Sequence, residues 1–169
     1  MITASKLRTS APSIDIKVDS TLWDGEPLAE QTVRDAIAAA ATSLGTTDGE
    51  VSVVLTNDAG IKKLNREWRK IDKPTNVLSF PTPKTKKTGS AKLLGDIVIA
   101  YETLKRECGD EDRIFLHHLA HLSVHGFLHL IGYDHQNDSD ADEMEGLESK
   151  IMSVLKMPDP YLARDCGDA

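Results

Sequence analysis

The eleven residues 125–135 constrain this chain more than any other segment, because three of them are histidines at a fixed spacing. His125 and His129 are four residues apart, so on a helix their imidazoles project from the same face. Gly132 can adopt the left-handed conformation that ends a helix, which lets the chain turn back and bring His135 to the same point. Three neutral nitrogens around one point, with a fourth position open, describe a catalytic rather than a structural zinc site. The spacing therefore predicts one zinc ion per chain, held by His125, His129 and His135.

This spacing is that of the metzincin metalloproteases, H-E-x-x-H-x-x-G-x-x-H, with one difference. The chain has Gly126 where those peptidases have the glutamate that serves as their general base. The metal ligands are retained and the peptidase base is absent. A metallopeptidase is therefore an alternative only if another residue supplies the base.

Further histidines precede the motif. His117 is expected to have no role in the site. His118 and His121 lie seven and four residues before His125, so they extend its helical face and either support the site, contact substrate or are purely structural. A ligand set of His118, His121 and His125 is less attractive, because one rigid helix seldom brings three side chains around one ion. Asp134 either orients an imidazole, accepts a proton or serves only as a turn residue.

The length of 169 residues and the ordinary composition predict one globular domain over residues 13–162, with flexible ends at 1–12 and 163–169. No apolar run approaches the roughly 20 residues of a membrane span, and the N-terminus lacks the apolar region of a signal peptide. Cys108 and Cys166 match no CxxC pattern. We therefore expect a cytoplasmic protein with free thiols and no membrane contact.

The net charge of −7 argues against nucleic acid as a partner, but the charges are unevenly distributed. Residues 61–92 carry ten basic and two acidic side chains, and residues 137–168 carry nine acidic and three basic ones. Charge runs of this kind are usually solvated faces, which is the first interpretation of both runs. If the basic run folds over the metal, however, it predicts a strip that holds a phosphate backbone.

The hydrophobic pattern predicts an α+β fold with a four-stranded mixed sheet covered by helices, one of which carries the metal ligands. Strands are expected at 13–19, 50–56, 75–81 and 93–100. Helices are expected at 29–44, 59–70, 101–108, 111–131 and 140–156, with Asp58 and Ser139 as the N-caps of the second and the last. Residues 82–92 are expected to form a flexible, lysine-rich loop.

Arg69 lies at the end of a predicted helix, and composition alone assigns it no function. An arginine close to a metal can nevertheless bind a phosphate through two parallel hydrogen bonds, which lysine does less well.

Three blocks give the chain a resemblance to a known family: D-K-P-T-N-V-L-S-F-P at 72–81, L-G-D-I-V-I at 94–99 and the histidine motif. With the tail segments 142–148 and 159–161, they resemble the YbeY family of bacterial metal-dependent endoribonucleases. The resemblance implies zinc at the three histidines and Arg69 as a functionally important arginine. It also implies cleavage of single-stranded RNA in maturation of the 16S ribosomal RNA 3′ end and in ribosome quality control. The partners implied are ribosomal RNA and the small ribosomal subunit with its proteins, and no DNA is expected.

The resulting hypothesis is a zinc-dependent endoribonuclease with Arg69, His125, His129 and His135 as its catalytic residues. The alternatives are an assembly factor that uses a structural metal and does not cut RNA, and an atypical metallopeptidase.

Overall fold

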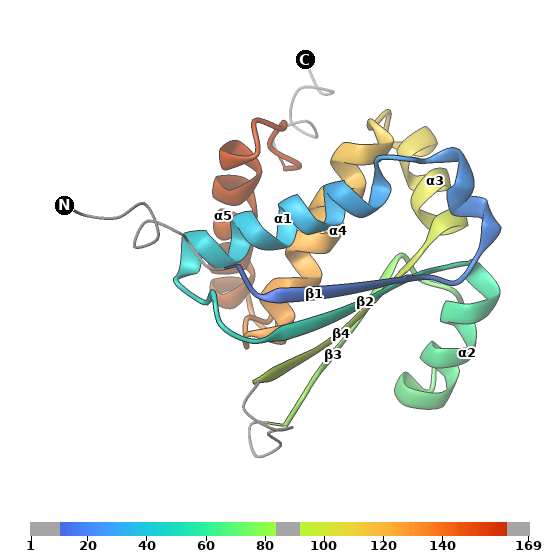
Figure 1. Ribbon diagram of the computed structural model, residues 1–169, viewed down its shortest axis with the longest axis horizontal. Coiled ribbons are helices and arrows are strands. Elements are labelled where there is room, and N and C mark those ends of the chain that lie inside the picture. The colour runs from blue at the N-terminus through green and yellow to red at the C-terminus, as the bar shows by residue number, and fades with distance from the viewer. Residues whose placement is uncertain (1–10, 84–91, 162–169) are drawn as a thin grey trace.

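The computed structural model describes residues 11–83 and 92–161. These residues fold around a four-stranded mixed sheet (Figure 1). Its strands lie in the order β1 (Ser13–Val18), β2 (Glu50–Thr56), β4 (Leu93–Ala100) and β3 (Val77–Pro81). The first three strands are parallel, and β3 runs antiparallel to β4 at the edge. The predicted α+β class and mixed sheet are confirmed.

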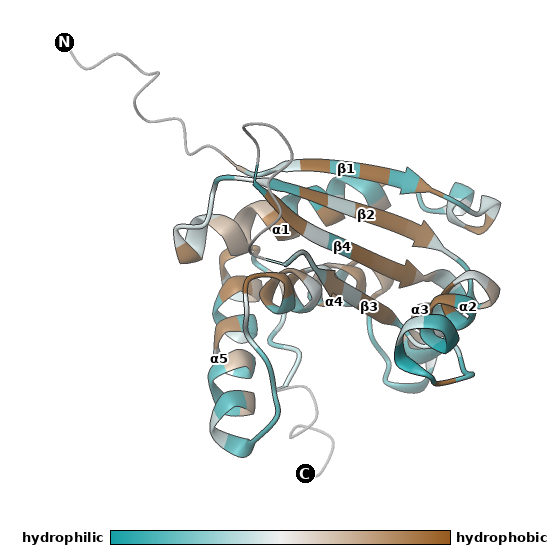
Figure 2. Cartoon of the chain, turned by 90° about the horizontal axis from the view of Figure 1, so that it is seen from below, coloured by the Kyte–Doolittle hydropathy of each residue, from teal (hydrophilic) through white to brown (hydrophobic). Residues whose placement is uncertain are grey.

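Two helices cover one face of this sheet: α1 (Ala29–Leu44) and α4 (Phe115–Leu130), with α5 (Asp138–Val154) packed against both. The opposite face is covered by α2 (Asp58–Arg69). A short 3-10 helix, η2 (Thr21–Gly25), follows β1, and α3 (Tyr101–Asp110) follows β4 and packs against α4. Figure 2 shows the apolar residues of the central strands between these layers.

The alternation of side chains explains why the two faces of the sheet are covered so differently. In β2, Val51, Val53 and Leu55 are buried in the main core under α1 and α4. In β4 both faces are buried, because Val98 and Ala100 pack with Ile61 of α2 in a second, smaller core. A fully buried side chain of this size contributes about 1.5–3 kcal/mol to folding. The larger core therefore holds α4, and with it the histidine motif, rigidly on the sheet.

Three details of the predicted helices are wrong. The histidine helix begins at Phe115 rather than at 111, because α3 ends at Asp110 and Asp112 adopts a positive φ of 51° in the connection. The N-caps are Asn57 and Asn137 instead of Asp58 and Ser139.

Asp58 is occupied by a different contact. Its carboxylate accepts hydrogen bonds from the backbone and hydroxyl of Thr103 and from Arg106 in α3. In return, Glu102 accepts from the Asp58 backbone N–H at 2.7 Å. The first turns of α2 and α3 thus satisfy each other's unpaired donors.

The expected flexible ends fall mostly on residues outside the described ranges, as does most of the 82–92 loop. In the part of the chain that is described, no helix combines the length and apolar character needed to cross a bilayer.

Candidate metal centre and the cleft beside it

The three predicted ligands meet at the C-terminal end of α4. His125 and His129 lie on its last two turns, and His135 follows in the loop after the helix. One ring nitrogen from each lies within 4.8 Å of the others, and the Nε2 atoms of His125 and His129 are 3.1 Å apart. Within the described residues, no other group of histidine, cysteine or acidic side chains gathers in this way.

The turn after α4 brings His135 back toward the helix. Gly132 has a φ of 108°, a conformation that favours glycine, as the sequence predicts. Its N–H donates to the His129 carbonyl at 3.2 Å, and the Tyr133 N–H donates to the Leu128 carbonyl at 3.0 Å. These two bonds form a Schellman motif, which satisfies carbonyls at the helix end while reversing the chain.

Asp134 serves this turn, which is one of the roles left open for it by the sequence. Its Oδ1 accepts a hydrogen bond from the His135 backbone N–H at 2.8 Å. That bond lowers the pKa of the Asp134 carboxyl, so the group is negative beside the three imidazoles. Asp134 therefore fixes the backbone of His135 and also lines the site.

Glu148 of α5 is a buried carboxylate behind the site that sequence reasoning missed. Its side chain is 0% exposed, and Oε1 accepts from Nδ1 of His125. Burial opposes its ionisation, but hydrogen bonds with His121 and His125 prevail and lower the pKa of Glu148 to about 2. An ionised Glu148 requires the proton of His125 on Nδ1, which leaves the lone pair on Nε2, the atom that faces His129.

Two further groups hold Glu148 in place. His121 Nε2 lies 3.2 Å from Oε2 of the carboxylate, and the Tyr161 hydroxyl donates to the same oxygen. His121 thus supports the site through Glu148 instead of contacting a metal. His118 is directed elsewhere, with its Nε2 2.9 Å from Glu107 of α3. The alternative ligand set of His118, His121 and His125 is therefore not assembled.

The donor set fits a metal ion that prefers imidazole. Burial lowers the pKa of His129, and the nearby His125 and His135 lower it further, so the ring is favoured in the neutral form that a metal requires. A carboxylate behind one ligand, as Glu148 stands behind His125, is the common arrangement around protein-bound metals. The three histidines can therefore hold a metal ion.

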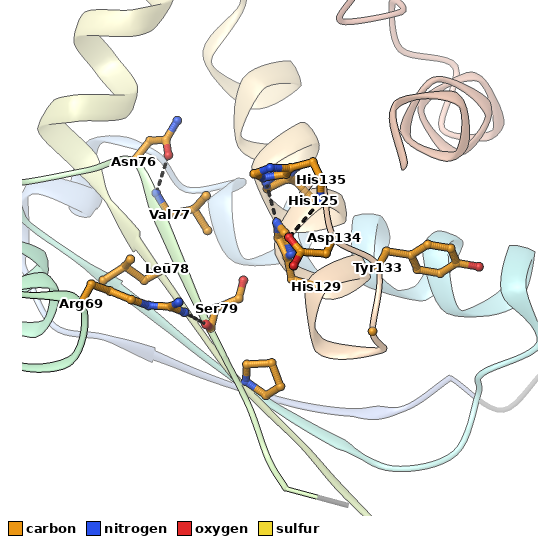
Figure 3. A pocket seen from close by; sticks show the side chains of 12 residues that line it. Arg69, Asn76, Val77, Leu78, Ser79, His125, His129, Tyr133, Asp134 and His135 are labelled. Carbon is orange, nitrogen blue, oxygen red and sulfur yellow. Dashed lines mark hydrogen bonds between the residues drawn. The ribbon is translucent and has the colours of Figure 1, made fainter. Parts of the chain in front are cut away.

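A cleft of about 480 Å³ opens beside the histidines and is bounded on its other side by β3 (Figure 3). The side chain of Arg69 reaches this cleft from the end of α2. Its Nη2 donates to the carbonyl of Ser79 at 2.8 Å, and its guanidinium lies 5.6 Å from the ring centroid of Phe80. The structure thus brings Arg69 and the three histidines to one cleft, which is also lined by Asn76, Val77, Leu78, Ser79, Pro81, Gly132, Tyr133 and Asp134.

Gly126 faces the sheet rather than the cleft. Its carbonyl accepts from the Ser79 hydroxyl at 3.2 Å. A Cβ atom at this position would lie 2.9 Å from Cγ2 of Ile97 and 3.2 Å from Oγ of Ser79. The absence of a side chain lets α4 approach β3 and β4 closely.

Comparison with known proteins gives consistent results. The family described as Endoribonuclease YbeY matches residues 17–156. A protein named Endoribonuclease YbeY from Bradyrhizobium diazoefficiens is 54% identical over 159 residues, which cover 90% of this chain and 87% of the relative. One of the same name from Nitrobacter winogradskyi is 52% identical over 163 residues, or 92% of this chain and 85% of the relative. A solution structure from Thermotoga maritima aligns at 24% identity and a TM-score of 0.46, covering 85% of this chain and 91% of that one.

Proposed function

The chain belongs to the YbeY endoribonuclease family, and we propose that it is a zinc-dependent enzyme that cuts single-stranded RNA. Membership makes it a hydrolase that acts on RNA. The finer assignment is maturation of the 3′ end of 16S ribosomal RNA and ribosome quality control in the cytoplasm, with the small ribosomal subunit and its proteins as partners.

One observation carries this proposal: three imidazoles that can hold a metal and one arginine line the same cleft. Phosphodiester cleavage needs an aligned nucleophile and charge neutralisation on the phosphoryl group more than it needs a peptidase's proton shuttle. The cleft offers positive charge on Arg69 opposite the histidines, and the sequence has Gly126 where the peptidases have their glutamate base.

The residues of the cleft have separate tasks in this proposal. When bound, zinc would supply Lewis acidity, which lowers the pKa of water toward about 7 and offsets charge on a phosphoryl oxygen. His125, His129 and His135 would hold it, with Glu148 keeping His125 in the required tautomer. Arg69 would bind the phosphate, because a planar guanidinium donates two parallel hydrogen bonds to it.

A cleavage assay on a single-stranded RNA tests the proposal directly. Zinc-loaded protein is expected to cut the RNA, and His129→Ala, purified identically, is expected not to cut it. Equal cleavage by both proteins would identify a contaminating nuclease and overturn the proposal. Degradation of casein would favour the metallopeptidase alternative, and RNA binding without cleavage would favour the assembly factor.

A further inference from the structure

Trp68, at the C-terminal end of α2, is exposed in a way that a packing role does not explain. Its side chain is 68% exposed, although tryptophan has more apolar surface to bury than any other residue. The only other tryptophan of the sequence, Trp23, is 4% exposed and donates to the Thr56 carbonyl. One tryptophan is thus a core residue and the other presents its ring to solvent.

The ring of Trp68 is connected to the metal cleft by direct contacts. Its centroid lies 6.3 Å from that of Phe80 in an edge-to-face arrangement. The guanidinium of Arg69 lies over the same Phe80 ring and bonds to Ser79 on the edge strand β3. Trp68 and Arg69 therefore both lie against the same Phe80 ring. A strand of RNA whose phosphate lies at Arg69 would pass close to Trp68.

The segment of the chain that carries Trp68 is strongly basic. Between residues 61 and 73 the chain carries six basic and two acidic side chains. Four cations of this segment are exposed and form no ion pair with any of the described residues: Lys62, Lys63, Arg66 and Lys73. Such unpaired charge complements a phosphate backbone, whereas a docking site for a protein partner is typically depleted of lysine.

We propose that Trp68 is a base-stacking platform: it stacks one nucleobase of a single-stranded RNA whose neighbouring phosphate lies at Arg69. Aromatic rings beside cationic grooves are the usual means of binding single strands without sequence preference. The inference rests on the proposed function for the identity of the polymer, and it adds a defined site outside the metal cleft.

Intrinsic fluorescence can test this, because only Trp68 is exposed. Full-length His129→Ala protein is titrated with a ten-nucleotide single-stranded RNA, so that no cleavage interferes. Quenching of Trp68 emission is expected, with a matched abasic strand of the same length producing little quenching. The same titration on a Trp68→Phe background reports Trp23 alone and should show no change. Equal quenching by the RNA and the abasic strand would overturn the proposal.

Affinity gives the second readout. Trp68→Ala should raise the Kd for the RNA about tenfold, while Trp68→Phe should stay near the parent protein, because a phenyl ring still stacks. Val154→Ala is the matched control, since Val154 is 58% exposed on α5, which packs against α1 and α4 and not beside α2. An unchanged Kd for Trp68→Ala would refute the platform, and so would quenching caused by a ribosomal protein but not by RNA.

The endoribonuclease function and the stacking site at Trp68 can be refuted independently of each other. Cleavage by the zinc-loaded parent without base-dependent quenching would remove the stacking site and leave the enzymatic function intact. Base-dependent quenching without any cleavage would do the reverse.

Discussion

The two walls of the cleft are built in opposite ways. The α4 wall offers three imidazoles backed by the buried Glu148, and all three ligands come from eleven consecutive residues. The β3 wall offers a cation, Arg69, which arrives from α2 and reaches the edge strand only after the chain has crossed to the other face of the sheet. A metal site can therefore be encoded locally, whereas the group that faces it depends on the order of the strands. The predictions below test whether the walls also act separately.

The largest effect is expected from His129→Ala in the α4 wall. Losing one of three protein ligands should abolish zinc binding and RNA cleavage together. Zinc content measured by inductively coupled plasma mass spectrometry should fall from one per chain to near zero. His117→Ala should keep its zinc, since this residue is outside the ligand cluster. Full zinc content in His129→Ala would contradict the assignment.

Arg69→Lys tests the β3 wall with the α4 wall left intact. Charge is retained but the planar two-point contact is lost, so activity should fall about 100-fold, the scale for removing one preorganised donor. Zinc content should remain one per chain. Arg66→Lys, an exposed exchange one turn earlier on the same helix, should change activity little. Wild-type turnover by Arg69→Lys would assign Arg69 a structural role only.

Glu148→Gln separates the ligands from the carboxylate behind them. An amide of the same size is uncharged and no longer holds the proton on Nδ1 of His125 as strongly. Zinc affinity, measured by competition with a chromogenic chelator, should fall about 10–100-fold. Glu145→Gln, exposed on the same helix, provides the comparison and should bind zinc normally. Equal affinities would mean that Glu148 only fills the core.

The smallest effect concerns how α2, which carries Arg69, is attached to α3. Burial raises the pKa of Asp58, but hydrogen bonds from Thr103 and Arg106 outweigh it and hold that pKa below the ordinary 3.8. The stabilisation is therefore fully present above pH 3.8 and is lost as the pH falls through the lower folded value. Asp58→Asn should cost about 1 kcal/mol at pH 7 by urea unfolding, with zinc content unchanged.

The same comparison at a pH well below 3.8 should show a smaller difference between Asp58→Asn and the parent protein, because the native carboxyl becomes protonated as the pH falls through its lowered pKa. Asp72→Asn is the control, since Asp72 is an exposed carboxylate shortly after the end of α2. A difference that stays constant with pH would show that the charge of Asp58 does not contribute.

The sequence allowed prediction of features that depend on neighbouring residues. The spacing of the histidines predicts the three-residue cluster and the turn at Gly132, and the apolar alternation predicts the sheet. The prediction of Asp58 as an N-cap is wrong because Asn57 and Asp58 are adjacent and both suited to the role. Only the packing of α3 against α2 occupies Asp58 elsewhere.

Glu148 could have been found from the sequence. It lies on a helical stripe with Met144, Ile151 and Met152, all of which are buried. An acid within an apolar stripe is rarely buried unless it has partners, so its presence indicates an internal site. Tyr161 gives no such signal, because its contact with Glu148 comes from a segment outside any regular element.

Gly126 restricts how this scaffold can change. In the metzincins the corresponding position carries the glutamate that activates water, whereas this chain has glycine there. Here a glutamate would collide with Ile97 and Ser79 and separate the histidine helix from the sheet on which its geometry depends. The glycine itself costs about 1 kcal/mol of helix propensity, which close packing offsets. A glutamate at this position would therefore need room between α4 and the sheet as well as a place at the cleft.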